Sequence, residues 1–315
     1  MLSLRLESQN TFDRFMTKKD SFHTTRFWLF ASGSTAITTV AFISLNNVWY
    51  AQYPRSSFHF FNDMGEWENM DKFGHVFTAY FQANLISNGY KWAGVQNKKA
   101  AWAGFITASI YQGALEYLDG TSTNWGFSVP DFLSNEIGAG IFLSQQLTWK
   151  EQRIRIKYSN TPYTYSNNLI YSADGQSSIS YKKRANDLFG KSYSQTFFKD
   201  YNASTVWLSV NPASFCNQKP NWLPSWLNLA VGFGANNLYG GFKNEFEIDG
   251  KHYLVDSNLK RQRQYFLSFD IDLSKVKSKN KLLSTILNIF NIIKIPSPTL
   301  EYNSSGYFKF HPLYF

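Results

Sequence analysis

Cysteine is almost absent from this chain: among its 315 residues only Cys216 carries a thiol. A single cysteine excludes an intramolecular disulfide framework, but it does not decide the compartment, because many periplasmic proteins also lack disulfides. Familiar active-site motifs are missing too. The sequence has no phosphate-binding loop, no dinucleotide fingerprint, no Gly-x-Ser-x-Gly elbow and no His-Glu-x-x-His helix. No such motif therefore assigns a reaction.

Aromatic residues, in contrast, are abundant. They make up 18% of the chain, with 29 Phe, 19 Tyr and 10 Trp. Tyr and Trp concentrate where an apolar body lies beside a polar rim, as at the interfaces of a lipid bilayer. The composition therefore favours a protein that meets a membrane.

Basic residues are unevenly distributed. Residues 1–150 contain 11 Lys and Arg and 11 Asp and Glu, so the whole net charge of +9 lies in residues 151–315. We expect that half to meet an anionic surface. Its basic residues form no stripe and no nucleic-acid motif, so we predict a membrane lipid or lipopolysaccharide surface as the partner, and no nucleic acid. A basic surface that is merely solvated is the alternative.

The N-terminal part contains an apolar run. Residues 1–26 are polar, whereas Phe27–Ala51 is largely uncharged and has aromatic residues at both ends. Its length, about 25 residues, exceeds the roughly 7–15 of a signal-peptide core and suffices to cross a bilayer. Ser, Thr and Asn dilute the run, so we expect an uncleaved helix packed on its neighbours. A signal sequence and a plain soluble helix are the alternatives. No cysteine follows the run closely, so no lipoprotein-type lipidation site is expected.

Three polar pairs, each with four-residue spacing, characterise residues 54–150. The spacing places both members of a pair on one face of a helix. The surrounding residues are aromatic or small, and buried polar groups persist only when they are hydrogen-bonded, paired or bound to a metal. The sequence therefore predicts a helical bundle of about four helices with a polar centre. The pairs are Asp71/His75, Gln112/Glu116 and Asp131/Asn135.

Candidate roles follow from the residue types. A divalent metal is the candidate cofactor, because carboxylate and imidazole groups from several helices hold Zn²⁺, Mn²⁺ or Fe. Capping is the alternative for Asp131, since an acid three residues after Ser128 stabilises a helix start by itself. The candidate catalytic residues are Asp71, His75, Glu116 and Asp131. The candidate metal ligands are His75, Glu116 and Asp131. The further candidates for ligand binding or for the polar centre are Lys72, Gln112, Asp119 and Asn135.

The order of these residues resembles a known family. The chain is similar to the YfiM-like predicted periplasmic lipoproteins of unknown function in three motifs. These are Asp-Lys-x-x-His at Asp71, Glu-x-x-Asp at Glu116 and Asp-x-x-x-Asn-x-x-Gly at Asp131. They are also distantly similar to VanZ-like membrane proteins. The C-terminal half resembles longer cell-envelope versions found in Bacteroidetes. The resemblance implies an envelope location and a polar helical core, and it supplies no catalytic assignment.

Residues 151–315 change to the period of β-strands. Alternation in Arg153–Tyr158 and Tyr265–Leu273 predicts strands, and about five clear strands are expected. Amphipathic helices are expected at Arg184–Tyr201 and Leu282–Ile295. The strand count is below the eight that a membrane barrel needs, so we favour an open or partly closed sheet.

The predicted fold class is thus α+β, a helical bundle followed by an aromatic-rich antiparallel sheet with one or two amphipathic helices. The expected segments are 1–26 (polar), 27–53 (anchor or packed apolar helix), 54–150 (bundle with polar centre) and 151–315 (basic, strand-rich and membrane-associated).

These observations predict a bacterial cell-envelope protein, located at the outer membrane or its periplasmic face, whose polar centre is structural or binds a ligand. Two alternatives remain. One is a membrane-associated, metal-dependent hydrolase that acts on a lipid or cell-wall intermediate. The other is an accessory subunit of an envelope secretion or assembly complex.

Overall fold

The computed structural model describes residues 12–46, 54–278 and 280–315, and these form two compact units. The helical unit takes the described residues up to 63 together with 75–153 and 272–292, and the sheet unit takes 64–74, 154–271 and 293–315. The boundary at residue 74 falls inside one continuous helix. The predicted α+β class, several helices followed by a mostly antiparallel six-stranded sheet, is confirmed.

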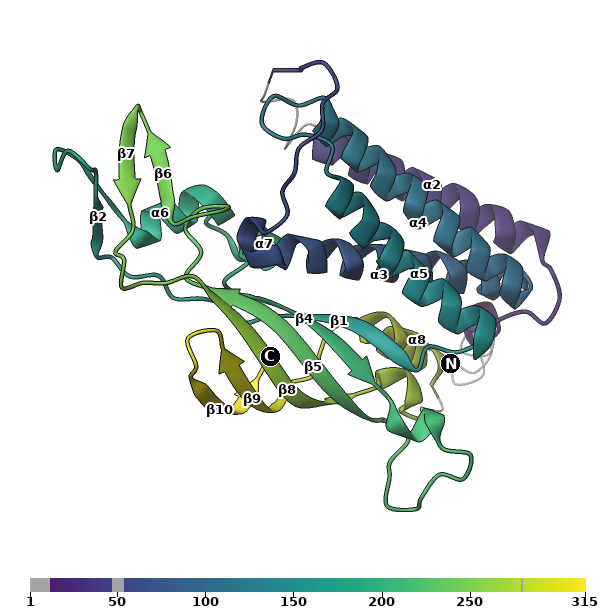
Figure 1. The fold of residues 1–315 in the computed structure, drawn as a ribbon. Coiled ribbons are helices and arrows are strands. Elements are labelled where there is room, and N and C mark those ends of the chain that lie inside the picture. The colour runs from purple at the N-terminus through teal and green to yellow at the C-terminus, as the bar shows by residue number, and fades with distance from the viewer. Residues whose placement is uncertain (1–11, 47–53, 279) are drawn as a thin grey trace, which may run out of the picture. The chain divides into compact units, whose positions relative to one another are not determined.

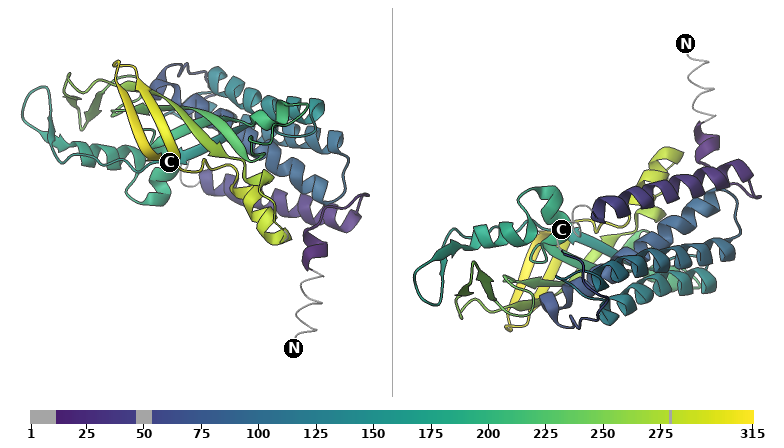
Figure 2. Two further views of the ribbon diagram at one scale, coloured as in Figure 1. Left: turned by 90° about the horizontal axis from the view of Figure 1, so that it is seen from below. Right: turned by 90° about the horizontal axis from the view of Figure 1, so that it is seen from above.

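The main helices lie beside one another in Figures 1 and 2. The short helix η2 (Glu66–Asn69) leads into the first turn of α3. Ser128 begins α5 as predicted, because its hydroxyl accepts the backbone N–H of Asp131 at 3.0 Å and donates to Asp63 at 2.6 Å. The helices are α2 (Thr24–Leu45), α3 (Met70–Trp92), α4 (Asn97–Gly120), α5 (Val129–Thr148) and α8 (Lys281–Phe290), and η4 (Leu273–Lys275) precedes α8.

The interior of the helical unit contains many small and polar side chains beside large ones such as Phe142, and many further large apolar side chains lie outside. Gly104 and Gly138 let backbones approach closely, since a Cβ at Gly138 would meet the carbonyl oxygen of Val76 at 2.2 Å. The buried polar residues of α4 and α5 include Gln112, Glu116, Asp131, Asn135, Gln145 and Gln146. Exposed apolar residues on the same helices include Ile106, Ile110, Leu133 and Ile137. This distribution is the reverse of that in most water-soluble bundles.

The sheet unit is built on six antiparallel strands in the order β1-β4-β5-β8-β9-β10 (Figure 1). Two small hairpins, β2–β3 and β6–β7, and several short helices, η2 among them, also belong to it. The main strands are β1 (Ile154–Asn160), β4 (Ser204–Val210), β5 (Leu227–Asn236), β8 (Gln262–Ile271), β9 (Ser297–Asn303) and β10 (Phe308–Tyr314). The smaller elements are β2 (Leu169–Tyr171), β3 (Ser178–Ser180), β6 (Glu245–Ile248), β7 (Lys251–Leu254), α6 (Tyr181–Phe189), α7 (Tyr193–Lys199) and η3 (Pro212–Phe215).

Several sequence-based boundaries need correction. The single helix expected at 184–201 is two helices, because Gly190 adopts a φ of +93° between α6 and α7. The strand expected at 265–273 ends at Ile271, where the Asp272 side chain accepts the backbone N–H of Ser274 at 3.0 Å and starts η4. Strand β9 was not expected. The apolar run expected at 27–51 forms α2, and its residues 47–51 lie outside the described residues, as do residues 1–11 of the polar N-terminal segment.

Two glycines of α5 provide a matched test of this packing. Gly138→Ala is expected to lower the free energy of unfolding by about 1–3 kcal/mol, because the new methyl group overlaps the α3 backbone. A Cβ at Gly140 would have no neighbouring atom within 4 Å. Gly140→Ala should therefore be neutral or stabilise by up to about 1 kcal/mol. Denaturant unfolding measures both, and equal effects would contradict the close approach.

Candidate polar centre

Three helices bring the predicted polar residues together. His75 lies on α3, Glu116 on α4, and Asp131 and Asn135 on α5. The Glu116 side chain is 2% exposed, that of Asp131 8% and that of His75 24%. A carboxylate with so little access to water is stable only beside partners that replace hydration. The His75 imidazole is such a partner for Glu116 and Asp131.

The two nitrogens of His75 face different partners. Nδ1 lies 3.1 Å from Oδ1 of Asn135 and 3.6 Å from Oε1 of Glu116. Asn135 in turn donates through Nδ2 to Oε1 of Glu116 at 3.4 Å. Because the amide oxygen of Asn135 only accepts, the proton belongs on Nδ1. Nε2 then faces Oδ1 of Asp131 at 3.7 Å.

Asp71 adds a second carboxylate near this nitrogen. It lies one turn before His75 on the same helix, and one ligand atom each from Asp71, His75 and Asp131 lies within 4.8 Å of the others. Asp71 also accepts hydrogen bonds from Lys72 and from the hydroxyl of Tyr201, each at 3.0 Å. The pair spacing predicted that Asp71 and His75 share a face of one helix, and the fold adds Asp131 from α5.

The arrangement fits a metal ion. A separation of 3.7 Å is too long for a hydrogen bond. It suits two ligands that each lie about 2.0–2.2 Å from one ion. Metal-binding histidines commonly donate their other ring N–H to a carbonyl or carboxylate, which fixes the ring orientation. Asn135 and Glu116 occupy those positions, so the geometry favours Asp71, rather than Glu116, as the third ligand.

Gln112 lies one turn before Glu116 and extends the polar interior. Its Nε2 donates to Oε1 of Gln82 at 3.1 Å and to the hydroxyl of Thr78 at 3.4 Å, both on α3. These bonds place Gln112 beside the centre. Asp119 lies in the last turn of α4, where its carbonyl oxygen accepts the backbone N–H of Ser122.

A cavity in the helical unit was not predicted. It has a volume of about 330 Å³, with Phe30, Phe81 and Ile289 on its apolar walls and Lys18 among its polar lining residues. Burial, and then the charge of Lys18, lower the pKa of nearby Lys91 to about 8. The wall residues come from helices far apart in the sequence, so no local pattern could have found it.

One family comparison gives a match. Residues 59–145 match the model of a family described as predicted periplasmic lipoprotein (DUF2279). The matched segment contains His75, Glu116, Asp131 and Asn135, so it covers the whole polar centre. No curated protein and no solved structure matches the chain. The match supports similarity to a periplasmic, lipoprotein-like family of unknown function, and with it a cell-envelope protein.

Asn135 provides a test of the hydrogen-bonded centre. Asn135→Leu keeps the side-chain size but removes the donor to Glu116 and the acceptor for His75. We expect a loss of about 1–3 kcal/mol in the free energy of unfolding, because buried polar atoms lose a partner. Asn288→Leu on α8 is the control, since Asn288 is exposed and bonds only to a carbonyl of its own helix among the described contacts. Equal stability of both variants would contradict the centre.

Proposed function

We propose that this is an envelope protein associated with the outer membrane, in which α3 and α5 bind a divalent metal ion through His75, Asp71 and Asp131. The observation that carries the proposal is the 3.7 Å gap between Nε2 of His75 and Oδ1 of Asp131, with a ligand atom of Asp71 close by. Asn135 and Glu116 act as positioning residues on the opposite side of the imidazole. One nitrogen and two carboxylates suit Zn²⁺, Mn²⁺ or Fe²⁺ better than Ca²⁺.

The envelope location and the lipid partner are supported by surface chemistry. Within the described residues one helix, Thr24–Ser44, is long and apolar enough to cross a membrane. Trp28, Ile37 and Val40 of this helix are exposed. We also propose that the protein is related to YfiM-like and VanZ-like proteins, that it lies at the outer membrane and that it contacts lipopolysaccharide.

The two alternative functions, a hydrolase and an accessory subunit, require different features of the polar centre. A hydrolase needs a coordination position open to water, and the 24% exposure of the His75 side chain is the observation that favours it. A bound metal would there polarise the scissile bond or activate a water molecule. An accessory subunit of a secretion or assembly complex would need no chemistry at the centre.

Metal titration tests the centre directly. Purified full-length protein, stripped with a chelator and titrated with Zn²⁺ or Mn²⁺, should bind one ion, and His75→Ala should weaken binding by a factor of ten or more, as loss of a ligand does. His252→Ala is the matched control, because His252 is exposed on β7. Absence of binding by correctly folded protein would leave a hydrogen-bonded centre without a metal. Glu116→Gln should weaken binding less than Asp131→Asn, whereas the reverse order would identify Glu116 as the ligand.

Cell fractionation tests the location. The full chain should remain with the outer-membrane fraction after carbonate extraction, because its exposed apolar side chains favour lipid over water. Quantitative recovery in the soluble cytosolic fraction would contradict the envelope assignment. Recovery in the soluble periplasmic fraction would contradict only the outer-membrane part of it.

A further inference from the structure

The six-stranded sheet turns its apolar face outward. The strand register aligns one residue from each of five neighbouring strands in a row. These side chains are 42–59% exposed, and Leu229 and Phe269 form a second exposed row. A sheet with one solvated face usually places its polar residues on that face. The aligned residues are Leu208, Val231, Leu267, Leu300 and Phe310.

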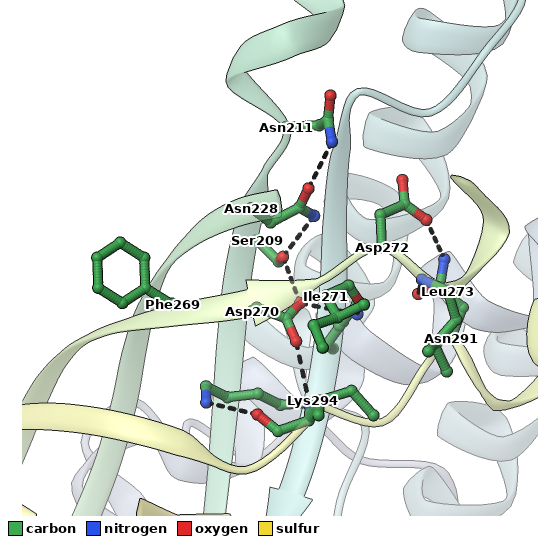
Figure 3. A network of polar contacts seen from close by, with 12 residues as sticks. Ser209, Asn211, Asn228, Phe269, Asp270, Ile271, Asp272, Leu273, Asn291 and Lys294 are labelled. Atoms are coloured by element: carbon green, nitrogen blue, oxygen red, sulfur yellow. Dashed lines mark hydrogen bonds and ion pairs between the residues drawn. The ribbon is translucent and has the colours of Figure 1, made fainter. Parts of the chain in front are cut away.

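The opposite face is buried and combines an apolar cluster of Trp207, Ala230 and Phe266 with a network of paired polar groups. Lys157 and Asp270 form an ion pair at 2.7 Å with no exposure of either side chain. Ser209 donates to Asp270 at 2.6 Å, and Asn228 donates to Ser209 at 2.9 Å. Figure 3 shows this network, with the Phe269 ring pointing away from it. Breaking a buried pair leaves an uncompensated charge without water, which is strongly destabilising. The network therefore fixes which face is inside.

The segment that follows α8 covers part of the polar face. The backbone N–H of Ile295 donates to Oδ1 of Asp270 at 3.1 Å. The ammonium group of Lys294 lies 4.7 Å from the centre of the Trp207 ring and donates to the hydroxyl of Ser297. Within the sheet unit these polar groups make the contacts that water would make with the buried face if it were exposed. Within residues 12–46, 54–278 and 280–315, no such cover lies on the outward apolar rows, whose side chains remain exposed.

Aromatic residues flank the apolar rows at both strand ends. At one end Tyr265 and Tyr302 are paired in register, and Phe308 follows on β10. Arg263 lies beyond Tyr265 on the same face of β8. At the other end, the segment between β4 and β5 exposes Phe215, Trp222 and Trp226. A band of aliphatic residues between two aromatic belts is typical of a surface that crosses the layers of a bilayer.

The length of the band along the strands favours lipid. Trp226 and Phe233, which pairs with Tyr265, lie seven positions apart, and at roughly 3.3 Å per residue this is about 23 Å along the strand. Apolar bands on outer-membrane strands are about 25 Å tall. A protein partner would need an apolar surface but would give no reason for aromatic belts at both ends.

We propose that this face of the sheet, centred on Leu267 and Leu300, contacts the acyl chains of a bilayer, with the two aromatic belts at headgroup level. The contact is through one face, because a sheet of six strands with two edges is not a closed membrane wall. The proposal rests on the envelope location proposed above and is independent of the metal centre.

Site-specific quenching tests the contact. Cys216 is the only cysteine, so Cys216→Ser gives a background in which Leu267→Cys or Leu300→Cys carries a bimane fluorophore. The labelled full-length protein is reconstituted into vesicles of phosphatidylethanolamine and phosphatidylglycerol with brominated acyl chains. Iodide in the buffer serves as the aqueous quencher. Glu247→Cys, at an exposed position on β6, is the control, and circular dichroism compares the fold of each variant with that of the unsubstituted chain.

The expected result is several-fold stronger quenching by brominated chains at positions 267 and 300 than at 247, with the reverse order for iodide. Quenching of both sheet positions by iodide alone would overturn the proposal, because the face would then be in water. Protection from both quenchers would also overturn it and would point to a protein covering the face, such as a second copy. If fractionation recovers the chain in the envelope and quenching fails, only this proposal fails.

Discussion

A buried ionisable side chain is stable only where protein groups replace the water that it has lost, and this constraint governs both units. In the helical unit it places His75 between Glu116 and Asp131. In the sheet unit it pairs Lys157 with Asp270, which is hydrogen-bonded to Ser209. Polar groups occupy part of each interior, and many large apolar side chains, such as Ile110 and Leu300, lie outside. The same constraint thus accounts for the partners found in both polar centres.

Short side chains meet in the helical unit because the backbones approach closely. Gly138 lies three residues after Asn135, and a Cβ there would meet the carbonyl oxygen of Val76, the residue after His75. This contact brings α5 close enough for Asn135 to reach Nδ1 and for Asp131 to face Nε2. The close approach of the two helices thus determines which partners face each nitrogen of the imidazole.

The sequence predicted those features of the fold that depend on residues close together in the chain. The Ser128-Val129-Pro130-Asp131 start of α5 follows from capping, and the four-residue spacing correctly joined Asp71 to His75 and Asp131 to Asn135 on shared helices. Alternation in Tyr265–Leu273 predicted a strand, because successive side chains point to opposite faces, and the strand ends at Ile271. It did not say which face is buried, since that depends on partners elsewhere in the chain.

The features that the sequence did not predict depend on contacts between residues far apart in the chain. Nothing in the alternating pattern around Lys157 distinguishes this residue, and its role depends on Asp270, which the fold places against it. Strand β9 contains Pro298 and Glu301, which weaken a local strand pattern, and its pairing with β8 through Leu300 and Leu267 forms the strand. The hydrogen bond of His75 to Asn135 likewise joins two helices. The spacing of these residues in the sequence predicted which helix face each one occupies. Which residue faces which nitrogen of the His75 imidazole could be seen only in the folded structure.

The proposed contact between the outward apolar face of the sheet and lipid is open to a direct test. Nuclear Overhauser effects between protein methyl groups and lipid acyl chains are measured with the full chain in lipid nanodiscs and methyl-labelled Leu, Val and Ile. We predict cross-peaks from acyl methylene protons to Val231, Leu267 and Leu300, which are exposed, and none to buried Val206. Cross-peaks from water to the first three residues, with none from lipid, would contradict it.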